Sequence, residues 1–245
     1  MSLKDKLIKE RLPRHVAVIM DGNGRWARRK GAARIFGHQN GVASVREVVE
    51  ACGELGIEYL TLYAFSTENW GRPAAEINAL MSLLVSTINQ ETKELMKNNV
   101  RLLTIGDLNL LPENPRNELV ELVELTRNNT RLTFVLALSY SSRTELVHAA
   151  KKIMADSIAG KITPDQMNSE LFESYLETAG IPDPELLIRT SGEYRISNFL
   201  LYQIAYTELY FTPKFWPDFR KEDLFAALLD YQGRERRFGK ISEQL

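Results

Sequence analysis

The sequence predicts an α/β fold: a single domain, residues 1–245, with a central, mostly parallel six-stranded sheet flanked by helices. Three observations predict it. Short apolar, β-branched runs alternate with longer segments whose apolar residues recur at helical spacing, as in strands joined by helical crossovers. Polar loops follow several of the apolar runs. No internal repeat or low-complexity linker divides the 245 residues, a length sufficient for one large core.

The strands are expected where apolar runs are bounded by turn residues. The first, 15–20, contains the run Val16 to Met20, whose composition is typical of a buried parallel strand. The others are expected at 57–65, 100–105, 131–139, a short run ending at Arg189, and 208–211.

The helices are expected where apolar residues recur three and four positions apart. A short charged helix is expected in the N-terminal segment 1–13, which Pro13 ends. The first long helix carries Val42, Val45 and Val49 on one face and stops at Gly56. Further helices are expected at 74–97, 113–127, 144–158, 164–179 and 223–238, with a helical turn at 200–205.

The composition excludes several classes of protein. A net charge of −1 provides no overall field for nucleic acid, so no nucleic-acid partner is expected. The single Cys52 rules out an internal disulfide, and three His without a Cys/His cluster argue against zinc. The N-terminus has no apolar signal core, and no apolar run is long enough to cross a bilayer. We therefore expect a cytoplasmic protein that is at most peripheral to the inner face of the membrane.

The loop after the first strand indicates an anion-binding site. Asp21-Gly22-Asn23-Gly24 breaks the strand, and glycines let backbone N–H groups approach a ligand closely. Cations follow at Arg25, Arg28, Arg29, Lys30 and Arg34. A carboxylate beside a phosphate site is unfavourable unless a metal lies between them, and Mg²⁺ bridges carboxylates to substrate phosphates in this way. Asp21 is therefore the first candidate metal ligand.

A dinucleotide site is the alternative interpretation of this loop. Gly22, Gly24 and Ala27 fit the pattern G-x-G-x-x-G/A after a strand. That pattern requires an acidic residue at the end of the next strand, whereas Glu47 and Glu50 lie in a predicted helix. Metal-assisted diphosphate binding is therefore the preferred interpretation.

Two further loops carry groups that suit phosphate. The second strand runs into Ser66-Thr67-Glu68-Asn69-Trp70-Gly71-Arg72-Pro73, at the sheet edge where open α/β sheets bind ligands. The fifth strand ends at Arg189, and Arg195 and Ser197 follow. Arginine forks suit bidentate phosphate contacts. Three such loops indicate two diphosphates rather than one.

Three segments of the chain resemble the signatures of the cis-prenyltransferases, the undecaprenyl diphosphate synthase family. They are 15–27, the run 62–73 with its S-x-E-N-W-x-R-P pattern, and 188–199, which reads I-R-T-S-G-E-x-R-x-S-N-F. The resemblance extends over nearly the whole chain. Residues 139–143, S-Y-S-S-R, depart from the family's N-Y-G-G-R. No P-loop motif and no D-D-x-x-D motif of trans-prenyltransferases is present.

The resemblance implies a homodimeric, Mg²⁺-dependent enzyme that condenses isopentenyl diphosphate onto farnesyl diphosphate. The allylic diphosphate would lie on residues 22–25, with Trp26, Arg34 and His38 nearby. The isopentenyl group would lie on Arg189, Arg195, Ile196 and Ser197, with the loop residues Ser66, Thr67, Glu68, Asn69, Trp70 and Arg72. Asp21 would hold Mg²⁺, helped by Glu208. A substrate oxygen, Asp21, or water organised by Asn69 would remove the proton.

The product is expected to be undecaprenyl diphosphate, the lipid carrier of bacterial cell-wall sugars. A tunnel would run along the helix 74–97, with Leu132 or Leu136 closing its far end. The product would leave through a transient peripheral contact with the membrane. The aromatic residues near the C-terminus suit a subunit interface: Tyr206, Tyr210, Phe211, Phe215 and Trp216. The alternatives are a shorter-chain synthase and a non-catalytic binding subunit.

Overall fold

Residues 2–237 are described by the computed structural model of the protein. Within that range six strands form one sheet in the order β3-β4-β2-β1-β5-β6, and every neighbouring pair is parallel. The strands are β1 His15–Ile19, β2 Tyr59–Ser66, β3 Val100–Ile105, β4 Leu132–Tyr140, β5 Leu186–Arg189 and β6 Glu208–Phe211. The expected parallel six-stranded sheet is confirmed.

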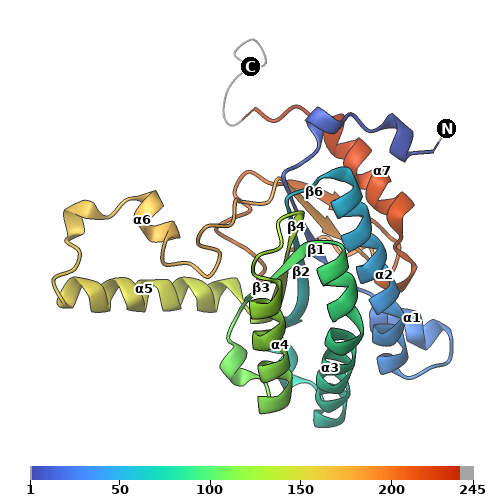
Figure 1. Ribbon diagram of the computed structural model, residues 1–245, viewed down its shortest axis with the longest axis horizontal. Helices are drawn as coiled ribbons and strands as arrows, with labels where there is room; N and C mark the ends of the chain where they lie inside the picture. Colours follow the sequence, from blue (N-terminus) through green and yellow to red (C-terminus); the bar gives the residue numbers. More distant parts are fainter. Residues whose placement is uncertain (1, 238–245) are drawn as a thin grey trace.

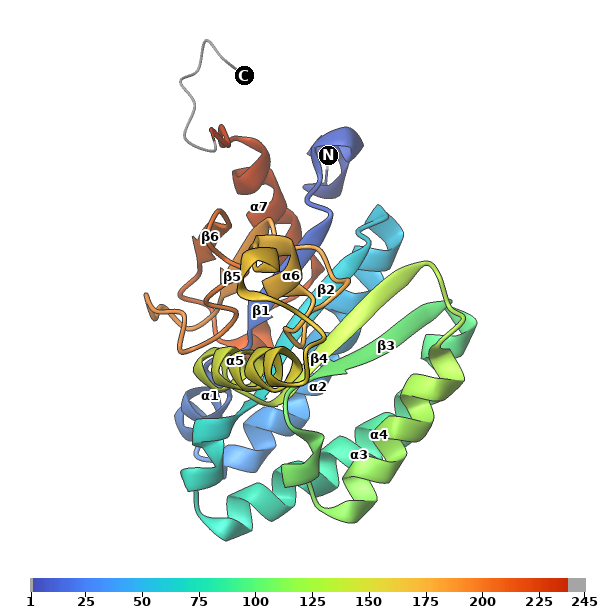
Figure 2. The ribbon, with the colours of Figure 1, turned by 90° about the vertical axis from the view of Figure 1, so that its left-hand side faces the viewer.

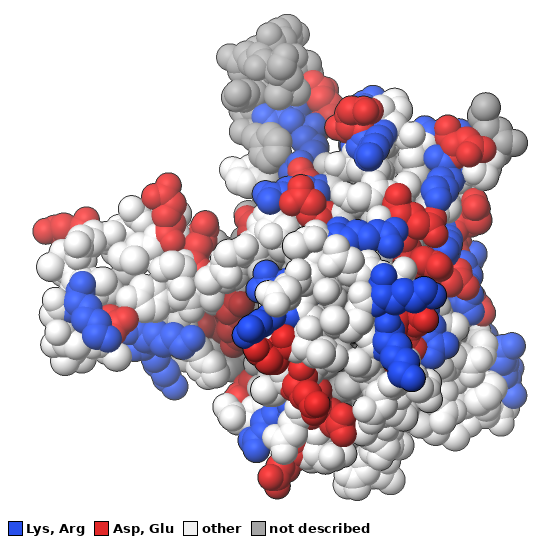
Figure 3. Space-filling view, in the orientation of Figure 1, with Lys and Arg blue, Asp and Glu red and all other residues white. Residues whose placement is uncertain are grey.

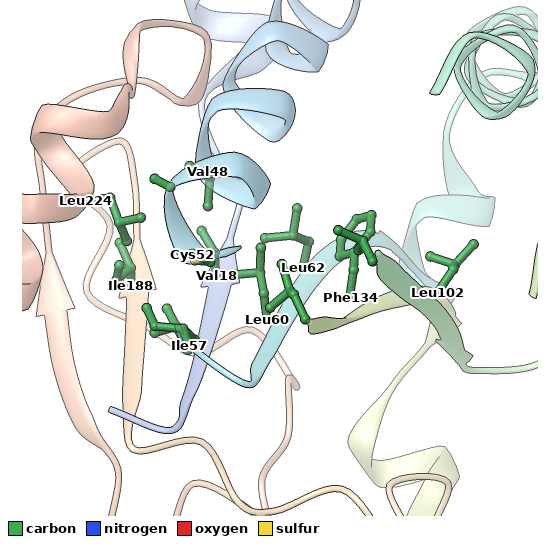
Figure 4. Close-up of a cluster of buried hydrophobic side chains, with 14 of the residues drawn as sticks. Val18, Val48, Cys52, Ile57, Leu60, Leu62, Leu102, Phe134, Ile188 and Leu224 are labelled. Atoms are coloured by element: carbon green, nitrogen blue, oxygen red, sulfur yellow. The ribbon is translucent and has the colours of Figure 1, made fainter. Parts of the chain in front are cut away.

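One face of the sheet is covered by helices α2, α3, α4 and α7 (Figures 1 and 2). The helices of the described residues are α1 Asn23–Arg29, α2 Arg34–Leu55, α3 Ala74–Lys97, α4 Glu113–Thr126, α5 Ser142–Ile158, α6 Ser169–Glu173 and α7 Lys221–Gln232. Figure 4 shows Val48 and Cys52 of α2 packed toward Val18 and Leu60 of the sheet. Cys52 is fully buried, so its role is packing.

The opposite face of the sheet is covered by irregular chain. Ala17, Ile19 and Leu187 alternate with the residues of the helical face, and they pack against Phe199 and Leu200. Because each strand is buried on both sides, β1 and β5 are almost continuously apolar. The segment 200–205, expected as a helical turn, forms turns in which the Ile204 N–H donates to the Leu200 carbonyl at 3.0 Å. It does not continue as a helix, and Leu200 has a φ of 49°, which a right-handed helix does not accommodate.

Helices α5 and α6 project from the body as an arm (Figures 1 and 2). The single helix expected at 164–179 is wrong, because only a 3-10 turn at Pro164–Gln166 and α6 form there. After α6, the backbone N–H of Glu177 donates to the buried carboxylate of Glu145 at 3.1 Å instead of to a helical carbonyl.

Both ends of the chain differ from their expected structure. Within residues 2–13 two 3-10 turns form, Lys4–Lys6 and Lys9–Arg11, instead of the one helix expected over 1–13. Helix α7 starts at Lys221, since the Asp223 carboxylate accepts the backbone N–H of Arg220 at 2.8 Å. It ends at Gln232 instead of continuing to Phe238, which lies outside the described residues.

Two of the residues expected at a subunit interface are instead buried in their own chain. Phe215 is 8% exposed and Trp216 is 1% exposed. No helix in the described part of the chain is both long and apolar enough to cross a membrane.

Two glycines of α2 place the loop after β1. A Cβ on Gly37 would lie 2.0 Å from the carbonyl oxygen of Asn23, and a Cβ on Gly41 would lie 2.9 Å from Trp216. These positions are one helical turn apart, so they form a groove on α2 that receives the loop and Trp216. The close approach fixes the start of α1 against α2.

We predict that Gly37→Ala lowers the free energy of unfolding by about 2–3 kcal/mol, because the methyl group overlaps the Asn23 carbonyl and α1 must move. Urea denaturation measures the change. Gly71→Ala is the matched control: nothing lies within 4 Å of a Cβ there, and we expect a change below about 0.5 kcal/mol. Equal losses in the two variants would contradict the close approach.

Candidate functional site

A cavity of about 710 Å³ lies between α2, α3 and the sheet. Its mouth is polar and follows the carboxyl ends of the strands, where Asp21, Ser66 and Arg189 lie. Its deep end reaches the amino ends of β3 and β4, at Val100 and Arg131. The walls between are apolar: Val42, Val45, Val49, Leu80, Leu84, Ile88, Leu102, Phe134, Leu136 and Leu138. This shape suits a ligand with an anionic head and a long apolar chain.

Asp21 lies at the centre of the mouth. Its Oδ2 accepts a hydrogen bond from Arg189 Nη2 at 2.9 Å and lies 3.2 Å from Arg25 Nη2. Burial alone would raise the pKa of Asp21, but the hydrogen bond and charge of Arg189 and the charge of Arg25 hold it below its ordinary value. Asp21 is therefore an ionised carboxylate. The turn needs Gly22, whose φ is 104° and whose Cβ would lie 2.6 Å from Phe215.

Glu193 connects two arginines from different loops. Its carboxylate oxygens lie 2.5 Å from Arg25 Nη1 and 2.5 Å from Arg195 Nη1. The buried Arg189 side chain also donates to Ser197 Oγ at 2.7 Å. The mouth therefore holds three arginines between two carboxylates.

Glu76 holds a second pair of arginines. It lies 3.2 Å from Arg34 Nε and 3.3 Å from Arg72 Nη1. His38 lines the cavity beside them, and its buried Nε2 has no hydrogen-bond partner among the described residues. Burial and then the charge of Arg72 lower the pKa of His38 to about 4. His38 is therefore neutral near pH 7 and is able to donate one hydrogen bond to an anion.

The loop after β2 is held in a fixed conformation. Asn69 Oδ1 accepts the backbone N–H of Ser66 at 3.2 Å, and the Ser66 side chain caps the 3-10 helix Thr67–Gly71. Trp70 Nε1 donates to Ser139 Oγ at 3.0 Å, and the ring packs edge-on against Phe65. The loop is thereby tied to the carboxyl end of β4.

The altered segment 139–143 makes its own contacts. Ser139 has a φ of 48°, a left-handed conformation in which asparagine is better tolerated than most residues. Ser141 Oγ accepts a hydrogen bond from Asn198 Nδ2 at 2.9 Å, and Ser142 Oγ accepts the backbone N–H of Leu201 at 2.9 Å. The two serines therefore fasten the start of α5 to the segment that follows Ser197.

The structure brings most of the predicted site residues together. Those that line the cavity are Asp21, Asn23, His38, Ser66, Asn69, Arg72, Arg189, Arg195 and Ser197. Others belong to the same loops without lining it: Gly22, Gly24, Arg25, Arg34, Thr67 and Glu68.

Three predicted substrate-binding side chains pack elsewhere. Trp26 is 8% exposed and donates from Nε1 to Asp218 Oδ1 at 2.7 Å. Ile196 packs against the core on the opposite face of the sheet. Trp70 packs on Phe65, as described above. The direction of each of these side chains is set by the packing of the whole fold, which the sequence pattern of a loop does not show.

The structure does not place Glu208, the expected second metal ligand, beside Asp21 of the same chain. Its register partner in β5 is Leu186, which in turn pairs with Val16, at the amino ends of the strands. Asp21 lies beyond the carboxyl end of β1, five residues further on, or roughly 16 Å of extended chain. The carboxylate of Glu208 is instead 2.9 Å from Arg234.

Asp21 alone fits a magnesium ion that is shared with a substrate. The described residues contain no group of three His, Cys, Asp or Glu side chains that could hold a metal. Mg²⁺ often takes one or two protein carboxylates and completes its shell with waters and substrate phosphates. Asp21 is ionised and 28% exposed at a cationic mouth, which matches that donor set.

Glu76, which pairs with Arg34 and Arg72, is a residue of the candidate site that the sequence analysis did not identify. A lone glutamate in the first turn of a helix is usually a dipole-favoured surface residue. Arg72 lies in extended backbone before α3, so no helical periodicity in the sequence relates it to Glu76; only the short separation of four residues was available as a signal.

The fold and the mouth define a class of protein: a parallel α/β protein that holds anionic groups at the entrance of an apolar cavity. The sequence profile of the family described as "Putative undecaprenyl diphosphate synthase" matches residues 19–239. The chain belongs to this family.

Relatives of known name and solved structures are consistent with that assignment. An isoprenyl transferase of Clostridium perfringens is 51% identical over 96% of this chain and 93% of its own. An isoprenyl transferase of Chlorobaculum tepidum is 53% identical over 96% of this chain and 88% of its own. Lavandulyl diphosphate synthase from Lavandula x intermedia, solved with dimethylallyl diphosphate, has a TM-score of 0.92 and 38% identity, covering 94% of this chain and 100% of its own. A probable undecaprenyl diphosphate synthase from Campylobacter jejuni has a TM-score of 0.78 and 35% identity, covering 93% and 99%.

We predict that the protein loses stability as pH falls from about 6.5 to 4, in part through His38. Its folded pKa of about 4 lies below the ordinary value of 6.5, so the unfolded state binds the proton first and is favoured in that interval. Between pH 7 and 5 this contributes about 2 kcal/mol. His38→Gln should reduce the loss by a comparable amount, measured as unfolding free energy at both pH values. An unchanged pH dependence would contradict a buried neutral His38. His15, buried with a pKa of about 4, contributes a loss in the same direction in both proteins. Asp183, whose pKa burial raises to about 6, contributes in the opposite direction in both.

Proposed function

We propose that the protein is a cis-prenyltransferase that condenses isopentenyl diphosphate repeatedly onto farnesyl diphosphate and releases undecaprenyl diphosphate. The observation that carries this proposal is the mouth of the cavity, where two sets of cations flank Asp21 and an apolar cavity begins behind them. One set suits the allylic diphosphate and the other suits the isopentenyl diphosphate. The cavity suits the growing chain.

The allylic diphosphate would lie on the backbone of residues 22–24 with Arg25, Arg34 and His38. The unpartnered Nε2 of His38 supports this assignment, because a bound phosphate oxygen supplies the missing acceptor. Family membership together with the dimethylallyl diphosphate named in the Lavandula x intermedia structure also supports it.

The isopentenyl diphosphate would lie on Arg189, Arg195 and Ser197, with Ser66 and Arg72 across the mouth. Fixing two substrates in one orientation provides the proximity that a bond-forming step needs. The terminal alkene carbon of isopentenyl diphosphate bonds to the allylic carbon as diphosphate leaves, and one proton is lost. Asp21, Asn69-organised water and a substrate oxygen are the candidate acceptors for that proton.

Asp21 would hold Mg²⁺. The ion, when bound, neutralises charge on the leaving diphosphate and so acts as a Lewis acid. Arg25 and Arg189 on either side of Asp21 would orient the carboxylate and share the remaining negative charge.

The proposal includes a homodimer that works in the cytoplasm and contacts the membrane transiently. Three apolar side chains on the projecting helix α5 are well exposed and suit a second copy of the chain: Val147 at 53%, Met154 at 62% and Ile158 at 86%. Figure 3 shows that much of the arm surface between its charged groups is uncharged.

The length of the product is set by the cavity. Leu136 lines the middle of its wall rather than its end, and Leu132 is buried without lining it. Small or modest side chains at the mouth, Val42 and Ala64, leave the entrance open. A shorter-chain synthase is the second candidate, and the fold similarity to lavandulyl diphosphate synthase favours it.

Incorporation of labelled isopentenyl diphosphate into extractable prenyl diphosphates tests the function. We expect incorporation with farnesyl diphosphate and Mg²⁺, and none with a chelator. The absence of incorporation under both conditions would support a binding subunit, and incorporation that a chelator leaves intact would contradict the role of Asp21.

We predict that Asp21→Ala lowers kcat and kcat/KM together by about 10³-fold or more, because several kcal/mol of transition-state charge stabilisation is lost. The free energy of unfolding, measured beside the steady-state rates, controls for folding. A near-normal kcat in Mg²⁺ would contradict the assignment of Asp21 as the metal ligand.

We predict that Arg195→Ala weakens isopentenyl diphosphate more than farnesyl diphosphate. A lost charge-assisted contact is worth roughly 1.5–3 kcal/mol, or about ten- to 150-fold in KM. The KM values of isopentenyl diphosphate and of farnesyl diphosphate, measured separately for Arg195→Ala and for the unchanged protein, test this prediction. A larger effect on farnesyl diphosphate would mean that the two sites are exchanged.

We predict that Leu84→Trp shortens the product, because a bulky ring on α3 would obstruct the middle of the cavity. Reverse-phase separation of dephosphorylated products measures the length. Leu125→Trp, on the outside of α4 at 49% exposure, is the control and should leave the length unchanged. An unchanged length in Leu84→Trp would show that the chain does not occupy this cavity.

A further inference from the structure

One corner of the molecule carries cations without acidic partners. From Gly22 to Arg46 the sequence contains six Lys or Arg residues and no Asp or Glu. Three of the six, Arg25, Arg34 and Arg46, pair with carboxylates from other segments. The other three are Arg28, Arg29 and Lys30. They are exposed at the end of α1, and none has an ion pair among the described residues.

An aromatic side chain lies beside these cations. Phe36, in the first turn of α2, is 42% exposed and stacks on Trp26 with a centroid distance of 5.7 Å. Lys30 Nζ lies 4.5 Å from the Trp26 ring, and Arg29 lies over the Phe215 ring at 4.4 Å. We call Arg28, Arg29, Lys30 and Phe36 the basic corner.

The basic corner is held rigidly by the structure beneath it. Trp26 is fixed by its hydrogen bond to Asp218, and Gly37 lets α2 approach the start of α1. The corner therefore presents cations and an aromatic ring together on a backbone that is already ordered, so a partner has only the exposed side chains to order.

The basic corner lies at the same end of the molecule as the cavity mouth. Asn23, at the start of α1, and His38, in α2 just after Phe36, both line the cavity. In Figure 1, α1 and the amino ends of α2 and α3 lie together at one end of the sheet. A surface that bound the corner would therefore lie next to the mouth.

We propose that the basic corner docks the protein on an anionic lipid bilayer, with the cavity mouth at the membrane surface. Clustered Lys and Arg side chains beside an exposed aromatic ring match the chemistry of an anionic lipid interface, which offers negative headgroups above apolar chains. A nucleic acid would favour a longer basic stripe, and the net charge of −1 provides none. The proposed function already includes a transient membrane contact, and the present inference rests on it in assigning that contact to the basic corner. The purpose of the docking would be delivery of a long-chain diphosphate to lipid.

Vesicle co-sedimentation tests the proposal. The full chain is mixed with vesicles of phosphatidylcholine alone, and with vesicles of phosphatidylcholine and phosphatidylglycerol. We expect binding to the anionic vesicles that weakens with added salt, because exposed charges are screened. Equal binding to both vesicles, or no binding to either, would overturn the proposal.

Matched variants locate the surface. The triple variant Arg28→Gln, Arg29→Gln, Lys30→Gln should bind the anionic vesicles about 100-fold more weakly, at roughly fivefold per charge. Phe36→Ser should weaken binding by a factor that salt does not change. The control is Lys151→Gln with Lys152→Gln, an exposed basic pair on α5, and should bind as the unchanged protein does.

Rates in vesicle-free solution separate this proposal from the proposed function. Contrary to the expectation from the sequence, Arg28, Arg29 and Lys30 lie outside the cavity mouth and do not line the cavity. The triple variant should therefore keep its isopentenyl incorporation within about twofold. Vesicle binding that is unchanged in the triple variant, or equally reduced in the Lys151 and Lys152 control, would place the membrane contact elsewhere. Failure of incorporation in the unchanged protein would overturn the proposed function and leave the vesicle result standing.

Discussion

The ion pair between Asp21 and Arg189 is the interaction on which the arrangement of the mouth depends. Ile19 and Arg189 are register partners at the carboxyl ends of β1 and β5, so the two loops that follow begin side by side. Arg189 is 3% exposed, and a guanidinium buried this deeply is costly without a carboxylate. Asp21 meets that requirement at 2.9 Å. The sheet register and this pair together fix where the two loops of the cavity mouth start, and Arg25 and Arg195 lie beside them.

The carboxylates of the mouth connect the two proposed diphosphate sites. Asp21 contacts an arginine of each, Glu193 lies between Arg25 and Arg195, and Glu76 lies between Arg34 and Arg72. Each of the latter two carboxylates also holds one arginine of the allylic set and one of the isopentenyl set. Because most of these pairs are partly exposed, each stabilises the fold only weakly, and an incoming diphosphate is able to replace the carboxylate. The carboxylates thereby orient the arginines before the substrate arrives. Replacing a carboxylate by a diphosphate then costs little binding free energy.

Sequence patterns predicted those parts of the molecule that local chemistry determines. Continuous apolar runs located the six strands of the described residues, and the polar loops after β1, β2 and β5 meet at the mouth of one cavity. The structure departs from the sequence-based expectations where distant packing decides the outcome. Glu208 follows the signature segment closely in the sequence, yet the sheet register places it at the other end of the strands. Trp26 lies within the first signature, but its indole N–H donates a hydrogen bond to Asp218, 192 residues away. In the segment 164–179 only a 3-10 turn and the short α6 form, and beyond α6 the backbone N–H of Glu177 donates to the buried Glu145, 32 residues away.

Simultaneous occupancy of the two proposed diphosphate sites is the central claim, and equilibrium binding measures it directly. The protein is first saturated with an allylic thiodiphosphate, whose sulfur link makes it a poor leaving group, and is then titrated with isopentenyl diphosphate by calorimetry in Mg²⁺. The account predicts that one isopentenyl diphosphate binds per chain while the allylic analogue stays bound. Displacement of the analogue by isopentenyl diphosphate would show a single shared site and would contradict the account.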